Sequence, residues 1–253
     1  MANIKICLDA GHYGKYNHSP AIPTYYESDM NWKLHLLLKR YLEQYGIEVV
    51  TTRPDKNTDL ELSARGQKAK GCNLFLSIHS NAVGSYVDEN VDYVRVYVPL
   101  NGSGTKIGEA LSKCIATVME TKQKCQTKTR ANDSGGEYYG VIRGAVSVGV
   151  PGLILEHSFH TNTRSTKWLM DDNNLDKLAK AEAEVIANYF GLSKLENDEK
   201  PVAKPVETPT EKVEDTILYR VQIGAYSKKE NAEKRLAEAK AAGFKDAFIA
   251  VSK

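Results

Sequence analysis

The sequence has little of the features that mark several large classes of protein. Its four cysteines, Cys7, Cys72, Cys114 and Cys125, form no Cys-x-x-Cys pair. Neither a zinc knuckle nor a dithiol redox motif is therefore indicated, and we expect reduced thiols. The most apolar uncharged run, residues 144–155, is only twelve residues long, whereas a membrane-spanning helix needs ~18 or more. The sequence predicts no transmembrane helix and no membrane partner.

A surplus of charge of one sign is missing as well. The 253 residues carry 34 Lys and Arg against 32 Asp and Glu, a formal net charge of +2. This balance gives no indication of a nucleic-acid partner, which usually requires a strongly basic domain. The N-terminus lacks a long apolar core behind a basic start and reaches a polar turn by residue 9, so we expect no secretory signal peptide.

Composition divides the chain into three parts. Residues 193–216 hold three of the eight prolines and no aromatic residue, which is typical of an extended linker that buries no core. The preceding 192 residues are enough for one substantial core. Only 37 residues follow. A domain shorter than ~40 residues usually needs further support to fold. We therefore expect a large domain at 1–192, a linker at 193–216 and a small unit at 217–253.

Short apolar runs alternate with longer helical patterns in the large domain. This alternation predicts an α/β fold, a mostly parallel twisted sheet with helices on both faces. The predicted strands are 4–9, 47–52, 74–79, 93–98 and 153–156. The predicted helices are 28–45, 60–70, 106–120 and 175–190, and His35 on the first of them is expected at the surface.

Several residues that can bind metal or transfer protons fall where the predicted strands end. His12, His79 and Glu156 stand at or just after these ends, the edge at which open α/β sheets build their sites. Glu27 precedes the first long helix and can reach the same edge. Two histidines and one carboxylate, with a fourth position left for water, form a catalytic rather than a structural zinc set. A further carboxylate can supply the general base.

A plainer interpretation of these residues is open at this point. A histidine in a loop is more often an ordinary polar residue than a metal ligand, and the chain has neither the H-E-x-x-H motif nor the Gly-x-Ser-x-Gly motif. His157 and His160 lie close enough to Glu156 to be supporting groups, or to have no part in the site.

The residues around these positions carry a resemblance to a known family. Segment Leu8–His12 resembles the opening Asp-Pro-Gly-His turn of the zinc-dependent N-acetylmuramoyl-L-alanine amidases called amidase type 3, and Glu27 resembles their helix-mouth glutamate. The further matches are Thr52-Arg53, Leu62 to Arg65, the strand end Ser77 to Asn81 and the segment Glu156 to Asn162. The resemblance covers residues 1–192 in the order of the family's motifs.

The resemblance implies a zinc hydrolase with one Zn²⁺ per chain. By position it implies His12, Glu27 and His79 as the zinc ligands and Glu156 as the catalytic carboxylate. The reaction implied is hydrolysis of the amide bond between N-acetylmuramic acid and L-alanine in bacterial peptidoglycan, with zinc-activated water and a glutamate general base.

Three positions depart from the family's pattern. Ala10 replaces the usual proline, and Tyr13 and Ser158 replace glycines. None of the three removes a ligand, but they leave loop shape and substrate preference open. Two other functions also stay open: a zinc peptidase acting on another bond, and a catalytically dead wall-binding protein, which would need a lost ligand. None of the four site residues is lost.

The absence of a predicted signal peptide bears on where such an enzyme would act. We expect a protein that is made in the cytoplasm and acts on the bacterial cell wall after release at lysis. A phage endolysin and a bacterial autolysin would both fit this expectation.

The small unit resembles a second family. Val221 to Ser227 resembles the Val-Gln-x-Gly-Ala-aromatic-Ser signature of the SPOR cell-wall repeat, whose members bind glycan strands of peptidoglycan. The pattern predicts a strand, a helix at 227–242 and a second strand at 246–251, one βαβ unit where the complete domain pairs two. Either the tail is vestigial, or two chains form a homodimer in which two such units complete a sheet.

Overall fold

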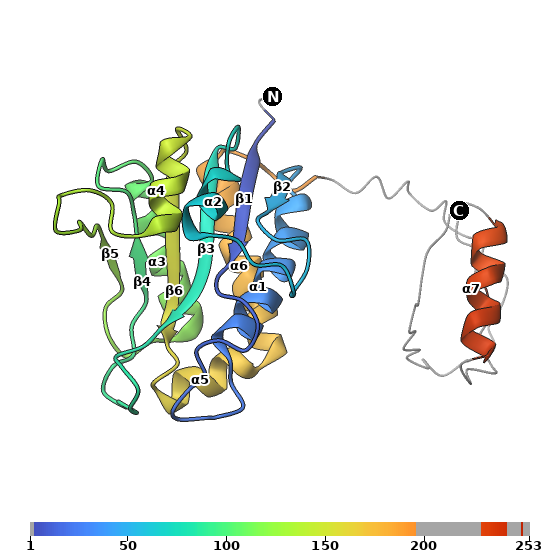
Figure 1. Cartoon of the computed structure of the whole chain (residues 1–253), viewed down its shortest axis with the longest axis horizontal. Helices are drawn as coiled ribbons and strands as arrows, with labels where there is room; N and C mark the ends of the chain where they lie inside the picture. The colour runs from blue at the N-terminus through green and yellow to red at the C-terminus, as the bar shows by residue number, and fades with distance from the viewer. Residues whose placement is uncertain (1–2, 196–228, 242–248, 250–253) are drawn as a thin grey trace, which may run out of the picture. The chain divides into compact units, whose positions relative to one another are not determined.

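The computed structural model describes residues 3–195, 229–241 and 249. The chain divides into two compact units, Met1–Glu199 and Lys200–Lys253. The first unit is a six-stranded sheet with helices on both faces (Figure 1), as predicted for an α/β fold. No helix in the described part of the chain is both long and apolar enough to cross a membrane.

Strands and helices alternate along the first unit, except at two places where two strands or two helices follow each other directly. Their order and bounds are β1 (Lys5–Ala10), α1 (Glu27–Glu43), β2 (Glu48–Thr51), α2 (Leu62–Gln67), β3 (Leu74–Asn81), β4 (Arg95–Tyr97), α3 (Thr105–Met119), β5 (Gln126–Lys128), α4 (Gly140–Ser147), β6 (Gly152–Phe159), α5 (Thr163–Met170) and α6 (Asp172–Tyr189).

The strands lie in the order β2-β1-β3-β6-β4-β5. The first four of these are parallel to one another, which confirms the mostly parallel sheet. β4 pairs with β6 in the antiparallel direction, and β5 runs parallel to β4. The sheet therefore reverses direction once, and the carboxyl ends of β3 and β6 lie beside the start of β4.

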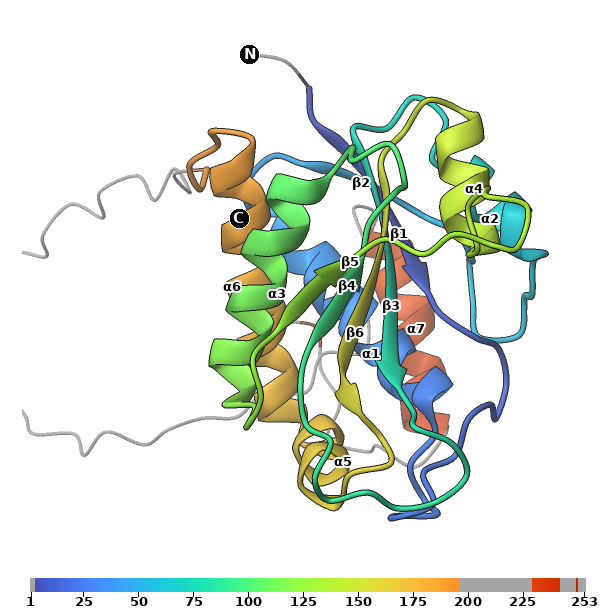
Figure 2. The same ribbon diagram turned by 90° about the vertical axis from the view of Figure 1, so that its left-hand side faces the viewer.

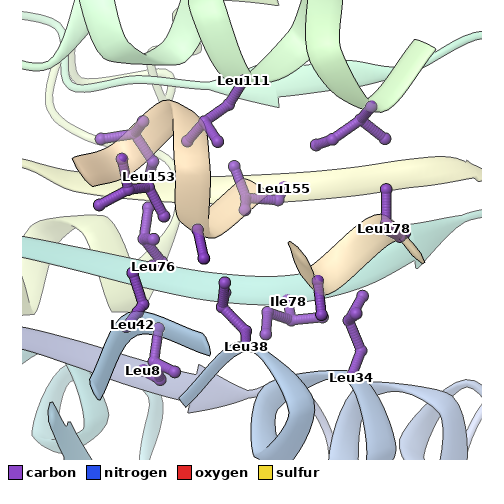
Figure 3. Packing of buried hydrophobic residues seen from close by; sticks show 14 of the residues in the cluster. Leu8, Leu34, Leu38, Leu42, Leu76, Ile78, Leu111, Leu153, Leu155 and Leu178 are labelled. Carbon is purple, nitrogen blue, oxygen red and sulfur yellow. The ribbon is translucent and has the colours of Figure 1, made fainter. Parts of the chain in front are cut away.

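Alternating side chains of the strands build a separate apolar layer on each face of the sheet, because successive residues of a strand point to opposite faces. On one face, Leu76 of β3 and Leu155 of β6 pack with Leu38 of α1 and Leu111 of α3, and α6 completes this larger core (Figure 3). On the other face, Phe75 packs with Ala69, just after α2, and with Ile142 and Ala145 of α4.

The helices α2 and α4 pack closely enough to touch through their backbones. A Cβ atom on Gly66 would lie 2.1 Å from the main-chain oxygen of Val141, and a Cβ atom on Gly144 would lie 2.1 Å from that of Ser63. Both helices are short, with 6 and 8 residues. They cover this face of the sheet only in part and leave the carboxyl ends of β3 and β6 uncovered (Figures 1 and 2).

The structure corrects the prediction for His35. This residue is 1% exposed, not at the surface. Its Nδ1 lies 2.6 Å from the main-chain oxygen of Trp32, and the two rings are 4.4 Å apart. The reason is that α1 is buried over a wide arc, against the sheet and against α6, so a position next to Leu34 is also covered.

Three elements were not predicted. β5 has only three residues, Gln-Thr-Lys, and no apolar run marks it. α4 and α5 have eight residues each and lie in stretches for which the sequence pattern predicted no helix or strand. α5 begins after Asn162, whose side chain accepts a hydrogen bond from the main-chain N–H of Ser165, a standard N-terminal cap.

The described part of the second unit is helix α7 (Lys229–Ala241). It lies within the predicted helix 227–242. Two ion pairs along its length, Lys229–Glu233 and Arg235–Glu238, have the spacing that stabilises an exposed helix. The two predicted strands of this unit and residues 196–216 of the predicted linker lie outside the described residues.

Candidate functional site

Three of the four predicted site residues meet at the uncovered edge of the sheet. One nitrogen of His12, one carboxylate oxygen of Glu27 and one nitrogen of His79 all lie within 4.8 Å of one another. In residues 3–195 and the described part of the tail, no other group of three or more His, Cys, Asp or Glu side chains could hold a metal ion. Two imidazoles and a carboxylate fit zinc, and this number of ligands leaves a coordination position open.

His12 reaches the cluster from the loop after β1. Its backbone has a φ of 61°, in the left-handed region that few residues other than glycine adopt. The imidazole stacks on the ring of Tyr16 at 4.7 Å. Its Nε2 lies 3.3 Å from Oε2 of Glu27 and 3.2 Å from Nδ2 of Asn17. The turned backbone and the tyrosine ring therefore fix the direction in which this imidazole points.

Glu27 is the first residue of α1 and is 1% exposed. Its Oε1 accepts a hydrogen bond from the main-chain N–H of Ser80 at 3.1 Å and lies 2.9 Å from Nδ1 of His79. Its Oε2 accepts one from Asn17 at 2.7 Å. Burial alone would raise the pKa of Glu27, but hydrogen bonds to His12 and His79 hold the pKa well below its usual range. The side chain is therefore a carboxylate with both oxygens fixed.

A chain of buried hydroxyl groups orients His79. Nε2 of His79 lies 3.1 Å from Oγ of Ser77, and that hydroxyl donates to Asp9 at 2.6 Å. Thr52 donates to the other oxygen of Asp9, also at 2.6 Å. Because Ser77 gives its single proton to Asp9, its oxygen accepts the Nε2 proton of His79, and Nδ1 keeps its lone pair for the cluster. Asp9 and Ser77 were not among the predicted site residues, although a polar residue inside an apolar strand is a usable signal.

Glu156 lies beside the cluster on the neighbouring strand. Glu156 is paired with His79 in the strand register, so the two side chains point to the same face of the sheet. The two strands lie about 4.8 Å apart. Oε2 of Glu156 is buried and finds no hydrogen-bond partner among the described residues. Burial, with the charge of Glu27 second, raises the pKa of Glu156 to about 8. A carboxyl group that titrates near neutral pH is suited to taking and returning a proton.

His157 and His160 lie on the opposite face and support the strand ends from behind. Nδ1 of His157 is 2.9 Å from the main-chain oxygen of His79, and its Nε2 is 2.7 Å from Glu182 of α6. Nδ1 of His160 is 3.0 Å from Oγ of Ser80. Neither histidine joins the three-residue cluster, so of the two alternatives, supporting groups or bystanders, the contacts favour the first.

Comparison with known families agrees with this geometry. The model of the N-acetylmuramoyl-L-alanine amidase family matches residues 6–188, which include the whole cluster and Glu156. The chain belongs to this amidase family. A second model, that of the SPOR domain, matches residues 207–253. The chain is accordingly a hydrolase, an N-acetylmuramoyl-L-alanine amidase that cleaves peptidoglycan.

Individual relatives extend over most of the chain. The N-acetylmuramoyl-L-alanine amidase CwlM of Bacillus licheniformis is 29% identical over 249 residues, covering 97% of this chain and 84% of that protein. The endolysin of Bacillus phage SPP1 is 28% identical over 193 residues, covering 75% of this chain and 67% of that protein. The catalytic domain of the amidase CwlV from Bacillus (Paenibacillus) polymyxa var. colistinus shares the fold, with a TM-score of 0.63, 23% identity, and coverage of 75% of this chain and 99% of that one.

Proposed function

We propose that this amidase works with a single zinc ion held by His12, Glu27 and His79, and that Glu156 is its general base and general acid. The observation that carries the proposal is the meeting of three ligand atoms within 4.8 Å, with Glu156 in register beside His79. When bound, zinc supplies a Lewis acid that polarises the scissile carbonyl and lowers the pKa of water.

The protein's own residues divide the remaining work. Glu156 takes a proton from the attacking water and returns it to the nitrogen of the departing L-alanine, the two halves of one acid–base cycle. Asp9 and Ser77 keep His79 in one tautomer, while Ser80 and Asn17 hold the two oxygens of Glu27. These supporting contacts arrange the three ligands before any ion binds, which favours affinity.

Metal analysis and product analysis together test this proposal. We expect about one zinc per purified chain, measured by plasma mass spectrometry. We expect purified peptidoglycan to release new L-alanine amino termini, and a chelator to stop the release. A chain without zinc whose activity resists the chelator would contradict the metal assignment. New amino termini on other residues would instead indicate a peptidase acting on another bond.

We further propose that the wall is reached at lysis, as an endolysin would reach it. The support is the likeness to the SPP1 endolysin, although a relative in Bacillus subtilis is a sporulation-specific amidase. Bacteria that express the protein in the cytoplasm should keep their turbidity until the membrane is permeabilised from outside, and should then lyse at once. Lysis without permeabilisation would contradict this route.

We propose that the chain consists of a catalytic domain at 1–192, a linker at 193–216 and a wall-binding unit at 217–253. We propose further that the wall-binding unit pairs with its copy in a second chain. The SPOR match supports glycan binding. The full chain should sediment with glycan strands stripped of stem peptides, which offer the catalytic domain no amide to cleave. A dimeric mass in light scattering is expected at high concentration, and a monomeric mass would exclude the pairing.

A further inference from the structure

Strand register places four polar side chains in one line across the sheet. His79 of β3 is paired with Glu156 of β6, Glu156 with Arg95 of β4, and Arg95 with Gln126 of β5. Directly paired residues of neighbouring strands point to the same face. The line therefore begins at the cluster and continues over the face that α2 and α4 leave uncovered. At about 4.8 Å per strand, the backbone of Arg95 lies about 10 Å from that of His79.

The guanidinium of Arg95 is held in place by neutral groups alone. Nη2 donates to the hydroxyl of Tyr93 at 2.5 Å and to Oε1 of Gln126 at 2.9 Å. Nη1 donates to the hydroxyl of Tyr97 at 3.1 Å, and Nε donates to Gln126 at 3.2 Å. Arg95 forms no ion pair with a carboxylate in the described part of the chain, although its charge offsets part of the rise in the pKa of Glu156, its partner across the strands. The protein thus orients a partly buried cation through neutral hydrogen-bond acceptors, with no carboxylate in direct contact.

Such an arrangement is suited to an anion that arrives from outside. Removing a charge from water without a partner costs free energy, and a bound carboxylate recovers that cost. Nη1 of Arg95 has a second N–H that none of the described residues accepts. Tyr93 accepts from Arg95, so its own hydroxyl proton is left to donate. Arginine and tyrosine together therefore offer two donors to one anion.

The order of the line indicates which half of the substrate lies over Arg95. In the proposed function Glu156 returns its proton to the departing nitrogen, so the peptide half leaves on the side of Glu156. The next strand on that side is β4. An extended peptide advances about 3.3 to 3.6 Å per residue, so the second residue after the scissile bond is about 7 Å from it. The second residue is therefore expected over β4, where Arg95 stands with its guanidinium turned toward Gln126 of β5.

We propose that Arg95, with Tyr93, forms a carboxylate subsite that recognises a free carboxylate on the second residue of the stem peptide. This inference rests on the proposed function, and it deepens that function by assigning a substrate preference. It also gives a role to β4 and β5, which contribute nothing to the metal cluster.

Two synthetic muramoyl peptides that differ in one group provide the test. One carries a free α-carboxylate on the second residue of the peptide, and the other carries the carboxamide. The wild type should cleave the carboxylate with a kcat/KM about 10- to 100-fold higher, the range of a hydrogen bond to a charged group. The difference should lie mainly in KM, because the subsite is remote from the reacting atoms.

Variants of Arg95 should abolish this discrimination. Arg95→Gln should bring the ratio of the two kcat/KM values close to one, and Arg95→Lys should keep part of it, since charge is retained but the planar fork is lost. Arg40→Gln, at an exposed arginine on α1 that pairs with Asp176, is the matched control and should keep the wild-type ratio. Zinc content and melting temperature should be equal in all four proteins.

A binding measurement separates this inference from the proposed function. Calorimetry on Glu156→Gln, which should turn over too slowly to consume the peptides during the measurement, compares the affinities of the two peptides directly. Equal affinities there, or equal kcat/KM values in the wild type, would overturn the subsite and leave the amidase mechanism intact. Failure of the wild type to digest purified peptidoglycan would overturn the mechanism, and the binding comparison would still decide the subsite.

Discussion

The imidazole of His79 occupies the space in which a side chain on residue 11 would lie, and Gly11 has no side chain there. A Cβ atom on residue 11 would lie 2.3 Å from Cε1 and 2.4 Å from Nε2 of His79, and 2.6 Å from the main-chain oxygen of Ile78. The N–H of Gly11 donates to that same oxygen at 3.1 Å. The unusual backbone angle in this loop belongs to His12, whose φ is 61°. Glycine is therefore required here to admit the imidazole of His79, beyond any part it has in the turn.

Replacing Gly11 by alanine should displace His79 and lower zinc affinity and activity together. We expect a further loss of about 1 to 3 kcal/mol in the free energy of unfolding, the usual cost of overpacking. Gly136→Ala is the control, because its added Cβ would meet only the side chain of Asn132 at 3.4 Å. Zinc content and urea unfolding are the measurements. Normal zinc content in Gly11→Ala would contradict the steric argument.

Glu156→Gln should keep its zinc and lose roughly 10²- to 10⁴-fold in kcat, the usual contribution of a positioned acid–base group. The amide has nearly the shape of the carboxyl group but cannot accept the proton. Glu109→Gln changes an exposed glutamate of α3 and should leave the rate unchanged. Release of L-alanine amino termini is the readout. A normal rate in Glu156→Gln would show that another group transfers the proton.

The burial of His35 should make stability depend on pH. Burial lowers the pKa of His35 to about 4, whereas the unfolded chain has a value near 6.5. Between these values the unfolded state binds the proton and the folded state does not, so the free energy of unfolding falls as pH decreases from about 6.5 to about 4. The loss is at most about 3 kcal/mol. In His35→Gln, urea unfolding should show a shallower fall over this range, and parallel curves would refute the assignment.

His157 and Glu182 form a buried pair between β6 and α6, both fully inaccessible to solvent. Glu182→Leu should cost about 3 to 5 kcal/mol, because the imidazole loses its partner inside the core. The double variant His157→Leu/Glu182→Leu should be more stable than Glu182→Leu alone, since the imidazole is then no longer left in the core without its carboxylate, and only the main-chain oxygen of His79 loses a side-chain partner. Urea denaturation of the full double-mutant cycle measures this coupling. Strictly additive effects would mean that the two side chains do not depend on each other.

Sequence patterns located the cluster because its parts are marked locally. His79 and Glu156 each end an apolar run, and the carboxyl ends of parallel strands meet at one edge of a sheet. Arg95 carried no such mark. Its place beside Glu156 depends on the antiparallel pairing of β4 with β6. Arg95 and Glu156 are 61 residues apart in the sequence, and no local pattern sets the register of such a contact. His35 was misplaced for a related reason, since its burial depends on how α1 packs against distant elements.

The reversal of direction within the sheet separates two groups of residues. The three residues of the cluster come from the loop after β1, the start of α1 and the end of β3. Arg95 and Gln126 belong to β4 and β5, which run the opposite way and are joined through α3. Substitutions at Arg95 or Gln126 therefore change the proposed carboxylate subsite without changing any residue of the cluster. The preference for one peptide over another can in this way be altered separately from the metal site.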